Sequence, residues 1–125
     1  HYFRDFAYCD SGMIPWLLIV ELISKCGRSL GDWTRERFEK FPSRGEINFT
    51  VADADASIAR VGKAYKGQAL SIDEMDGLSF DCDGWRFNLR KSNTEPLVRL
   101  NLEARGNVCG LEQRITELSA LILGR

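Results

Sequence analysis

Several short stretches in the second half of the chain alternate apolar and polar residues, which is typical of strands with one buried face. Residues 46–51 follow this pattern, and residues 98–104 follow it near the end of the chain. The three shorter alternating runs cover residues 70–72, 78–82 and 85–89. The pairs Asp76-Gly77 and Asp83-Gly84 separate these runs, and Asp-Gly between alternating runs is a strong hairpin signal. The pattern therefore predicts an antiparallel meander.

Two other stretches of this half carry apolar residues at helical spacing. The first stripe is formed by Ile58, Val61 and Tyr65, and the second by Leu111, Ile115, Leu118 and Ile122. Asp53 or Asp55 can cap the first of these helices by accepting a hydrogen bond from a backbone N–H. Gly67 is placed to end it. We therefore expect one helix after the first strand and another at the end of the chain.

The first part of the chain is predicted to contain a short strand and an apolar helix. Residues 2–8 are rich in aromatic side chains and are predicted to form a strand. An apolar helix is expected over about residues 12–26, with Asp10 or Ser11 as its N-terminal cap and Gly27 at its C-terminal end.

A second helix is predicted to follow, because Ser29 and Asp32 have the spacing of a capping box. This helix runs toward the segment 41–45, which contains Pro and Gly and is interpreted as a linker. The sequence therefore predicts two domains, residues 1–42 and residues 43–125.

The elements expected after the linker follow the order β-α-β-β-β-β-α, which predicts an α+β fold. In this fold two helices cover one face of an antiparallel sheet, and a short strand and two helices precede it. The other face of the sheet is free to meet a ligand. The alternation assigns to that face the side chains of Arg86, Asn88, Arg90, Arg99, Asn101 and Glu103.

The composition excludes some classes of partner. The chain has 125 residues, of which 44% are apolar, and its net charge is −1. A nucleic-acid-binding surface needs a clustered excess of basic residues, which this sequence lacks. The most apolar stretch, residues 12–23, contains Glu21 and is well short of the ~20 residues that span a bilayer. We therefore expect neither a nucleic-acid partner nor a membrane span.

The cysteines give no sign of a metal site. Cys9, Cys26, Cys82 and Cys109 are scattered without a Cys-x-x-Cys pair, and the single histidine is His1, so the spacing of zinc ligands is absent. An even number of cysteines permits disulfides, but the favoured interpretation is free thiols in a cytoplasmic protein.

The loop between the last two predicted strands gathers donors that suit a phosphate dianion. Arg90 offers a planar fork of N–H groups, and Ser92, Asn93 and Thr94 offer side-chain and backbone donors. If the two strands pair, Arg90 and Arg99 lie on the same outward face. The alternative interpretation is a hydrophilic turn between ordinary solvated arginines.

The run Arg90-Lys91-Ser92-Asn93-Thr94-Glu95-Pro96 resembles the Arg-x-Ser-x-Thr-Glu-Pro phosphate-binding loop of the α-D-phosphohexomutase family. Residues 97–104 resemble the strand that follows this loop. With residues 1–6 and 9–12 upstream, the chain is most similar to the bacterial phosphomannomutases of that family. The resemblance covers essentially the whole chain.

The resemblance implies that residues 1–42 end the sugar-binding third domain of a four-domain enzyme and that residues 43–125 form its C-terminal domain. In this family a phosphoserine, with Mg²⁺ nearby, exchanges phosphate with a hexose phosphate, while the C-terminal domain holds the phosphate that is not reacting. By position in the motif, this holding role is implied for Arg90, Ser92, Asn93, Thr94 and Arg99. The phosphoserine and the metal ligands would belong to domains that precede the chain, so the chain alone is expected to be inactive.

The implied reaction is the interconversion of mannose 6-phosphate and mannose 1-phosphate in the cytoplasm, for GDP-mannose and polysaccharide synthesis. A phosphoglucomutase or a phosphoglucosamine mutase is an alternative, because the sugar-reading loop would lie upstream. His1 falls beside the histidine segment of the family and is assigned no role. A non-enzymatic module that binds a phosphopeptide through the same loop is the alternative from another class, since fold does not fix function.

Overall fold

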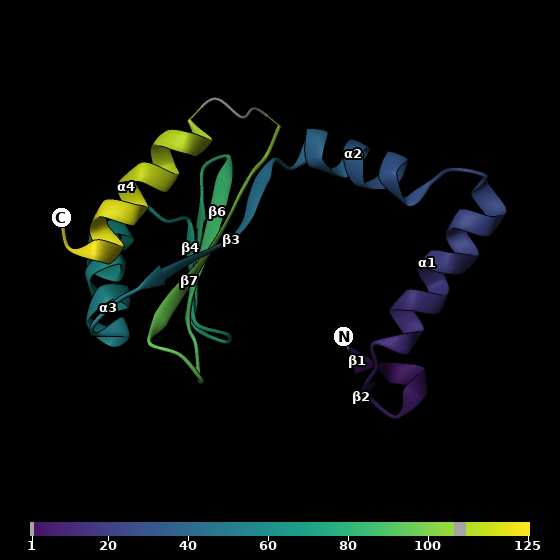
Figure 1. Cartoon of the computed structure of the whole chain (residues 1–125), viewed down its shortest axis with the longest axis horizontal. Helices are drawn as coiled ribbons and strands as arrows, with labels where there is room; N and C mark the ends of the chain where they lie inside the picture. Colours follow the sequence, from purple (N-terminus) through teal and green to yellow (C-terminus); the bar gives the residue numbers. More distant parts are fainter. Residues whose placement is uncertain (1, 107–109) are drawn as a thin grey trace. The chain divides into compact units, whose positions relative to one another are not determined.

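The computed structural model describes residues 2–106 and 110–125, which form two compact units, one up to Arg37 and the other from Phe38 onward. The elements of the second unit are β3 (Ser43–Thr50), α3 (Ala54–Tyr65), β4 (Ser71–Asp73), β5 (Leu78–Cys82), β6 (Trp85–Lys91), β7 (Leu97–Ala104) and α4 (Leu111–Leu123). These strands form one antiparallel sheet in the order β3-β7-β6-β5-β4, and α3 and α4 lie on the same face of it (Figure 1). The predicted α+β fold is confirmed, while the predicted domain division at residue 42 stays a prediction.

The core of this unit lies between the sheet and its two helices, because every second residue of the inner strands points toward the helices. On β7, Val98, Leu100 and Leu102 are at most 2% exposed, and Phe87 and Leu89 are equally buried on β6. The helices contribute the buried residues Val61, Tyr65, Leu111, Leu118 and Ile122. The apolar stripes predicted from the sequence are therefore the ones that pack.

Both Asp-Gly pairs lie at the predicted turns of the meander. Gly77 and Gly84 each have a φ of +77°, in the left-handed region that glycine adopts readily. A Cβ on Gly77 would lie closer than 3.0 Å to the carbonyl oxygen of Leu89, whereas a Cβ on Gly84 would meet nothing within 4 Å. The turn before β5 therefore packs directly against the backbone of β6.

The predicted linker over residues 41–45 is partly wrong, because β3 begins at Ser43. Ser43 pairs with Glu103 of β7, and the register shifts between Ser43 and Glu46. Gly45, with a φ of +72°, lies within this shift. A glycine and a register shift together are typical of a β-bulge, so part of the expected linker is an irregular strand.

The predicted strand over residues 2–8 is also wrong in its middle. The elements here are β1 (Tyr2–Phe3), the 3-10 helix η1 (Arg4–Phe6) and β2 (Cys9–Asp10), and the two strands pair with each other. Ala7 and Tyr8 have φ values of +52° and +57°, and Tyr8 donates its N–H to the carbonyl of Phe3 at 2.9 Å. These left-handed residues reverse the chain, and left-handed backbone is uncommon outside glycine.

The chain continues with α1 (Met13–Cys26) and α2 (Leu30–Lys40). Ser11 caps α1 by accepting a hydrogen bond on Oγ from the N–H of Ile14 at 3.3 Å. Gly27 ends α1 with a φ of +63°. The predicted capping box of α2 is confirmed: Asp32 accepts from the N–H of Ser29, and Ser29 Oγ accepts from the N–H of Asp32, both at 3.2 Å.

The side chains of α1 are largely exposed. The large apolar residues of α1 that are exposed are Met13, Trp16, Leu17, Leu18, Ile19, Val20 and Leu22. Among the residues that the structure describes, no helix combines the length and the apolar character needed to cross a bilayer.

Three cysteines are described, and all three are free thiols. Cys9 and Cys26 are exposed, while Cys82 is buried in β5. Burial raises the pKa of the Cys82 thiol, and the neighbouring Asp81 carboxylate adds to the effect. Cys109 lies outside the described residues.

Candidate functional site

The loop that joins β6 to β7 is short, and backbone hydrogen bonds fix both of its ends. Ser92 donates its N–H to the carbonyl of Leu97 at 3.0 Å, and Leu97 donates to the carbonyl of Glu95 at 2.8 Å. The carbonyl of Pro96 accepts from the N–H of Val51 at 3.2 Å, which ties the loop to the segment after β3. The position of the loop is therefore set by the sheet.

The side chain of Ser92 forms hydrogen bonds within this turn. Its Oγ accepts from the N–H of Thr94 at 3.4 Å and lies 3.3 Å from Thr94 Oγ1. Ser92 is half-buried, whereas Asn93 and Thr94 are exposed. The predicted backbone donors of Ser92 and Thr94 are therefore used within the loop, whereas the side-chain amide of Asn93 and the hydroxyl groups can donate to an oxyanion.

Two arginines stand beside the loop on neighbouring strands. Arg90 of β6 and Arg99 of β7 are direct cross-strand partners, whereas the alternation predicted only that they share a face. Leu89, which precedes Arg90, is buried, and so are Val98 and Leu100 on either side of Arg99. Both arginines therefore belong to the outward face. Directly opposed residues have Cβ atoms only about 4.5–5.5 Å apart, so their guanidinium groups can reach the same anion.

These residues line an open groove with a volume of about 800 Å³, within the usual range for small-molecule sites. All the site residues predicted from the sequence border this groove, namely Arg90, Ser92, Asn93, Thr94 and Arg99. The remaining lining comes from the start of α3, from the turn before β5 and the first residue of β5, and from the end of β6: Asp55, Ile58, Ala59, Glu74, Asp76, Gly77, Leu78 and Lys91. The fold thus brings the predicted residues together.

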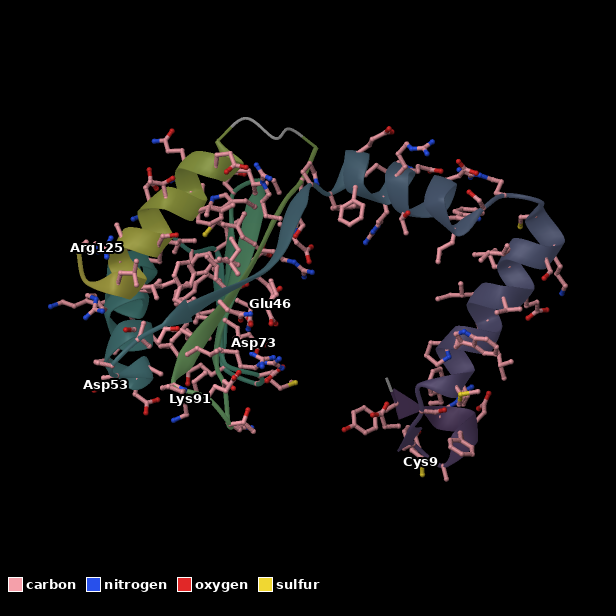
Figure 2. The ribbon with its side chains drawn as sticks, in the orientation of Figure 1. Cys9, Glu46, Asp53, Asp73, Lys91 and Arg125 are labelled. Carbon is pink, nitrogen blue, oxygen red and sulfur yellow. The ribbon has the colours of Figure 1, made fainter. Side chains whose placement is uncertain are left out.

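Carboxylates already contact two cations of the groove. Arg90 donates from Nη1 to Asp76 Oδ2 at 3.2 Å. Lys91, which Figure 2 labels, donates from Nζ to both oxygens of Asp55 at 2.9 and 3.0 Å. Exposed ion pairs of this kind contribute only about 0–1 kcal/mol each, so an incoming anion can replace them at small cost.

Arg99 is the more enclosed of the two arginines, with 30% of its side chain exposed against 43% for Arg90. Its Nη1 lies 3.6 Å from an oxygen of Glu46 on β3, a residue that Figure 2 labels. Its Nε is buried and has no hydrogen-bond partner among the described residues. A buried donor without an acceptor is unfavourable, so the Arg99 guanidinium is incompletely satisfied in this arrangement.

The sequence did not reveal the roles of Asp76 and Asp55 in this groove. Both were interpreted as turn or cap residues, yet each contacts a cation of the site. A signal was present for Asp76. When the register of the hairpin around Asp83-Gly84 is extended back along β5 and β6, Gly77 falls opposite Arg90.

The described residues do not fit a magnesium site. They contain no group of three or more His, Cys, Asp or Glu side chains that could hold a metal ion. Mg²⁺ prefers carboxylate and other oxygen ligands, whereas the carboxylates of Asp55 and Asp76 are paired with Lys91 and Arg90. We therefore assign no step to a metal held by this chain. His1 lies outside the described residues.

The fold and the groove together define a class of protein: an α+β unit in which a short polar loop and two opposed arginines line one groove. Residues 46–115 match the family model described as phosphoglucomutase/phosphomannomutase, C-terminal domain. Residues 1–41 match the model for the alpha/beta/alpha domain III of the same proteins. The chain belongs to the phosphoglucomutase/phosphomannomutase family, which confirms the resemblance to phosphohexomutases.

Curated relatives match almost the whole chain. A protein of Xanthomonas campestris pv. campestris named "Phosphohexose mutases" is 59% identical over 124 residues, which cover 99% of this chain and 28% of that relative. The phosphomannomutase of Salmonella montevideo is 54% identical over 122 residues, and that of Escherichia coli K12 is 52% identical over 122 residues. Each of these two matches covers 98% of this chain and 27% of the relative. The chain therefore spans less than a third of the length of these proteins.

Proposed function

We propose that the chain serves as the C-terminal part of a phosphomannomutase, which interconverts mannose 6-phosphate and mannose 1-phosphate, and that its groove holds the phosphate that is not reacting. One observation carries this proposal: the opposed arginines and the Ser92–Thr94 turn line the same groove. The groove offers a phosphate dianion donors from Arg90, Ser92, Asn93, Thr94 and Arg99.

This arrangement suits the reaction physically. Binding energy from a phosphate far from the reacting centre can position the reacting end of the sugar, so it contributes to turnover as well as to affinity. Guanidinium, hydroxyl and amide donors recognise the phosphate oxygens. A site built from such donors tolerates either orientation of the sugar that carries the phosphate.

The remaining chemistry would come from outside this chain. The transferring phosphoserine and Mg²⁺ are expected in the preceding domains of the whole protein, and residues 1–125 alone would have no mutase activity. The cytoplasm is the proposed location, in the supply of GDP-mannose for polysaccharides. The free thiols of Cys9, Cys26 and Cys82 are compatible with a reducing compartment.

A broader sugar range is a second candidate. The name of the Xanthomonas relative refers to phosphohexose mutases and favours an enzyme that accepts more than one hexose phosphate. In the whole protein, kcat/KM for mannose 1-phosphate, glucose 1-phosphate and glucosamine 1-phosphate distinguishes these cases. A preference for mannose 1-phosphate of less than tenfold would favour the broader assignment.

The phosphate-holding role is tested by an NMR titration of this chain with mannose 1-phosphate, mannose 6-phosphate and inorganic phosphate. We expect shifts centred on the amides of Ser92, Asn93 and Thr94 that are similar for both sugar phosphates. Arg90→Ala should weaken these shifts. Arg86→Ala is the matched control, because Arg86 lies on the same face of β6 but pairs with Glu103 at 3.1 Å outside this groove.

A second test uses the whole enzyme. Arg90→Ala should lower mutase activity at least tenfold and leave the fold intact, because a hydrogen bond to a charged group is worth about 1.5–3 kcal/mol. An unchanged rate for Arg90→Ala, or an equal loss for Arg86→Ala, would contradict the proposed role of the groove.

A further inference from the structure

Asp76 occupies an unusual place for a residue of an anion site, because it adds a negative charge beside Arg90. We propose that the Asp76 carboxylate orients Arg90 and competes with phosphate for it, so that the groove binds phosphate weakly and releases it readily. This inference rests on the proposed function of the groove as a phosphate site.

The backbone position of Asp76 does not depend on the guanidinium group of Arg90. Asn88 of β6 donates from Nδ2 to the backbone carbonyl of Asp76 at 2.8 Å and to Ser79 Oγ at 2.9 Å. The next residue, Gly77, packs so closely on the backbone of β6 that a Cβ would collide with it. These contacts fix the backbone of the turn, so that the Asp76 side chain starts beside Arg90.

The contact leaves most of the arginine available. Asp76 Oδ2 accepts from Nη1 of Arg90 at 3.2 Å, and a guanidinium group has five N–H donors. An anion can bind the other N–H groups, but it would then lie on the order of 6 Å from the carboxylate. Repulsion of a dianion at that distance in water, reduced by salt screening, corresponds to about a threefold to tenfold loss of affinity.

Two substitutions at this position separate charge from orientation. Asp76→Asn keeps an oxygen that can accept from Arg90 but removes the negative charge. It should therefore tighten phosphate binding. Asp76→Ala removes the charge and the acceptor together, so that Arg90 is no longer oriented, and it should tighten binding less than Asp76→Asn does.

Glu74→Gln supplies the matched control. Glu74 lines the same groove, and this substitution removes the same charge while the hydrogen bond between Asp76 and Arg90 remains. If competition for Arg90 is the cause, Glu74→Gln should change the affinity by less than twofold. The double variant with Arg90→Ala gives a further check, because Asp76→Asn should lose its effect when Arg90 is absent.

The test is an NMR titration of this chain and its variants with inorganic phosphate at fixed pH and salt, followed at Ser92, Asn93 and Thr94. A dissociation constant lowered about threefold to tenfold in Asp76→Asn, with a smaller change in Glu74→Gln, supports the proposal. An unchanged or raised constant in Asp76→Asn overturns it, while the proposed phosphate site stands. Absence of phosphate binding by the wild-type chain overturns both.

Discussion

Replacing Gly77 by alanine should destabilise the second unit much more than the same change at Gly84. Both glycines follow an aspartate in a hairpin turn, and both have a φ of +77°. Left-handed backbone costs a residue with a Cβ about 1–2 kcal/mol, so both variants carry this cost. They differ in what the added methyl group meets.

At Gly84 the new Cβ would meet nothing within 4 Å. At Gly77 it would lie closer than 3.0 Å to the carbonyl oxygen of Leu89 and 3.1 Å from Cα of Arg90. Both of those atoms belong to the backbone of β6, so relief requires the turn and the strand to separate. Overpacking of this kind adds about 1–3 kcal/mol. We expect total losses of about 2–5 kcal/mol for Gly77→Ala and about 1–2 kcal/mol for Gly84→Ala.

Urea unfolding followed at the amide resonances of Leu89 and Leu100, which are fully buried in the sheet, reports on the second unit alone. Because a small domain has a total stability of about 5–15 kcal/mol, the expected difference between the variants is readily measured. Equal losses for Gly77→Ala and Gly84→Ala, within about 0.5 kcal/mol, would refute the argument from close packing. Gly77→Ala should also weaken phosphate binding, because it displaces the backbone at Arg90.

Two further predictions concern α3. Burial is the main cause that raises the pKa of Tyr65 above its ordinary value of 10.0, and the Glu117 carboxylate adds to it. As the pH rises through 10, the unfolded chain releases a phenolic proton that the folded chain keeps, so the free energy of unfolding falls. Tyr65→Phe should flatten this fall in a plot of urea midpoint against pH, and an unchanged slope would contradict the assignment. Asp53 caps α3 by accepting from the N–H of Ala56 at 2.9 Å, so Asp53→Ala should cost about 1 kcal/mol in urea unfolding, whereas Asp53→Asn should retain most of the stability.

The sequence predicted the second unit well because its signals are local. Alternation decides which side of a strand is buried, and an Asp-Gly pair decides where the strand reverses. Together they set the register of β5 against β6, and alternation alone puts Arg90 and Arg99 on the same face of the sheet. The two arginines and the loop between them were therefore accessible without coordinates.

The features that sequence reasoning missed depend on conformations or contacts without a local signal. Ala7 and Tyr8 adopt left-handed backbone, although neither residue type favours it. The bulge at Gly45 lengthens β3 because residues far along the chain supply its partner strand. Asp76 contacts Arg90 across fourteen positions of sequence, and only the full register of the hairpin places the two side by side.

The opposition of Arg90 and Arg99 has a consequence for how the protein responds to its surroundings. Like charges on directly opposed strand positions disfavour the folded sheet. Asp76 and Glu46 offset part of this repulsion, and an anion that binds both arginines would offset more of it. Any anion that binds the folded chain and not the unfolded chain stabilises the folded state, by a free energy that grows with the logarithm of its concentration relative to its dissociation constant. The heat resistance of this chain should therefore depend on the buffer, with a higher melting temperature in phosphate than in chloride at equal ionic strength.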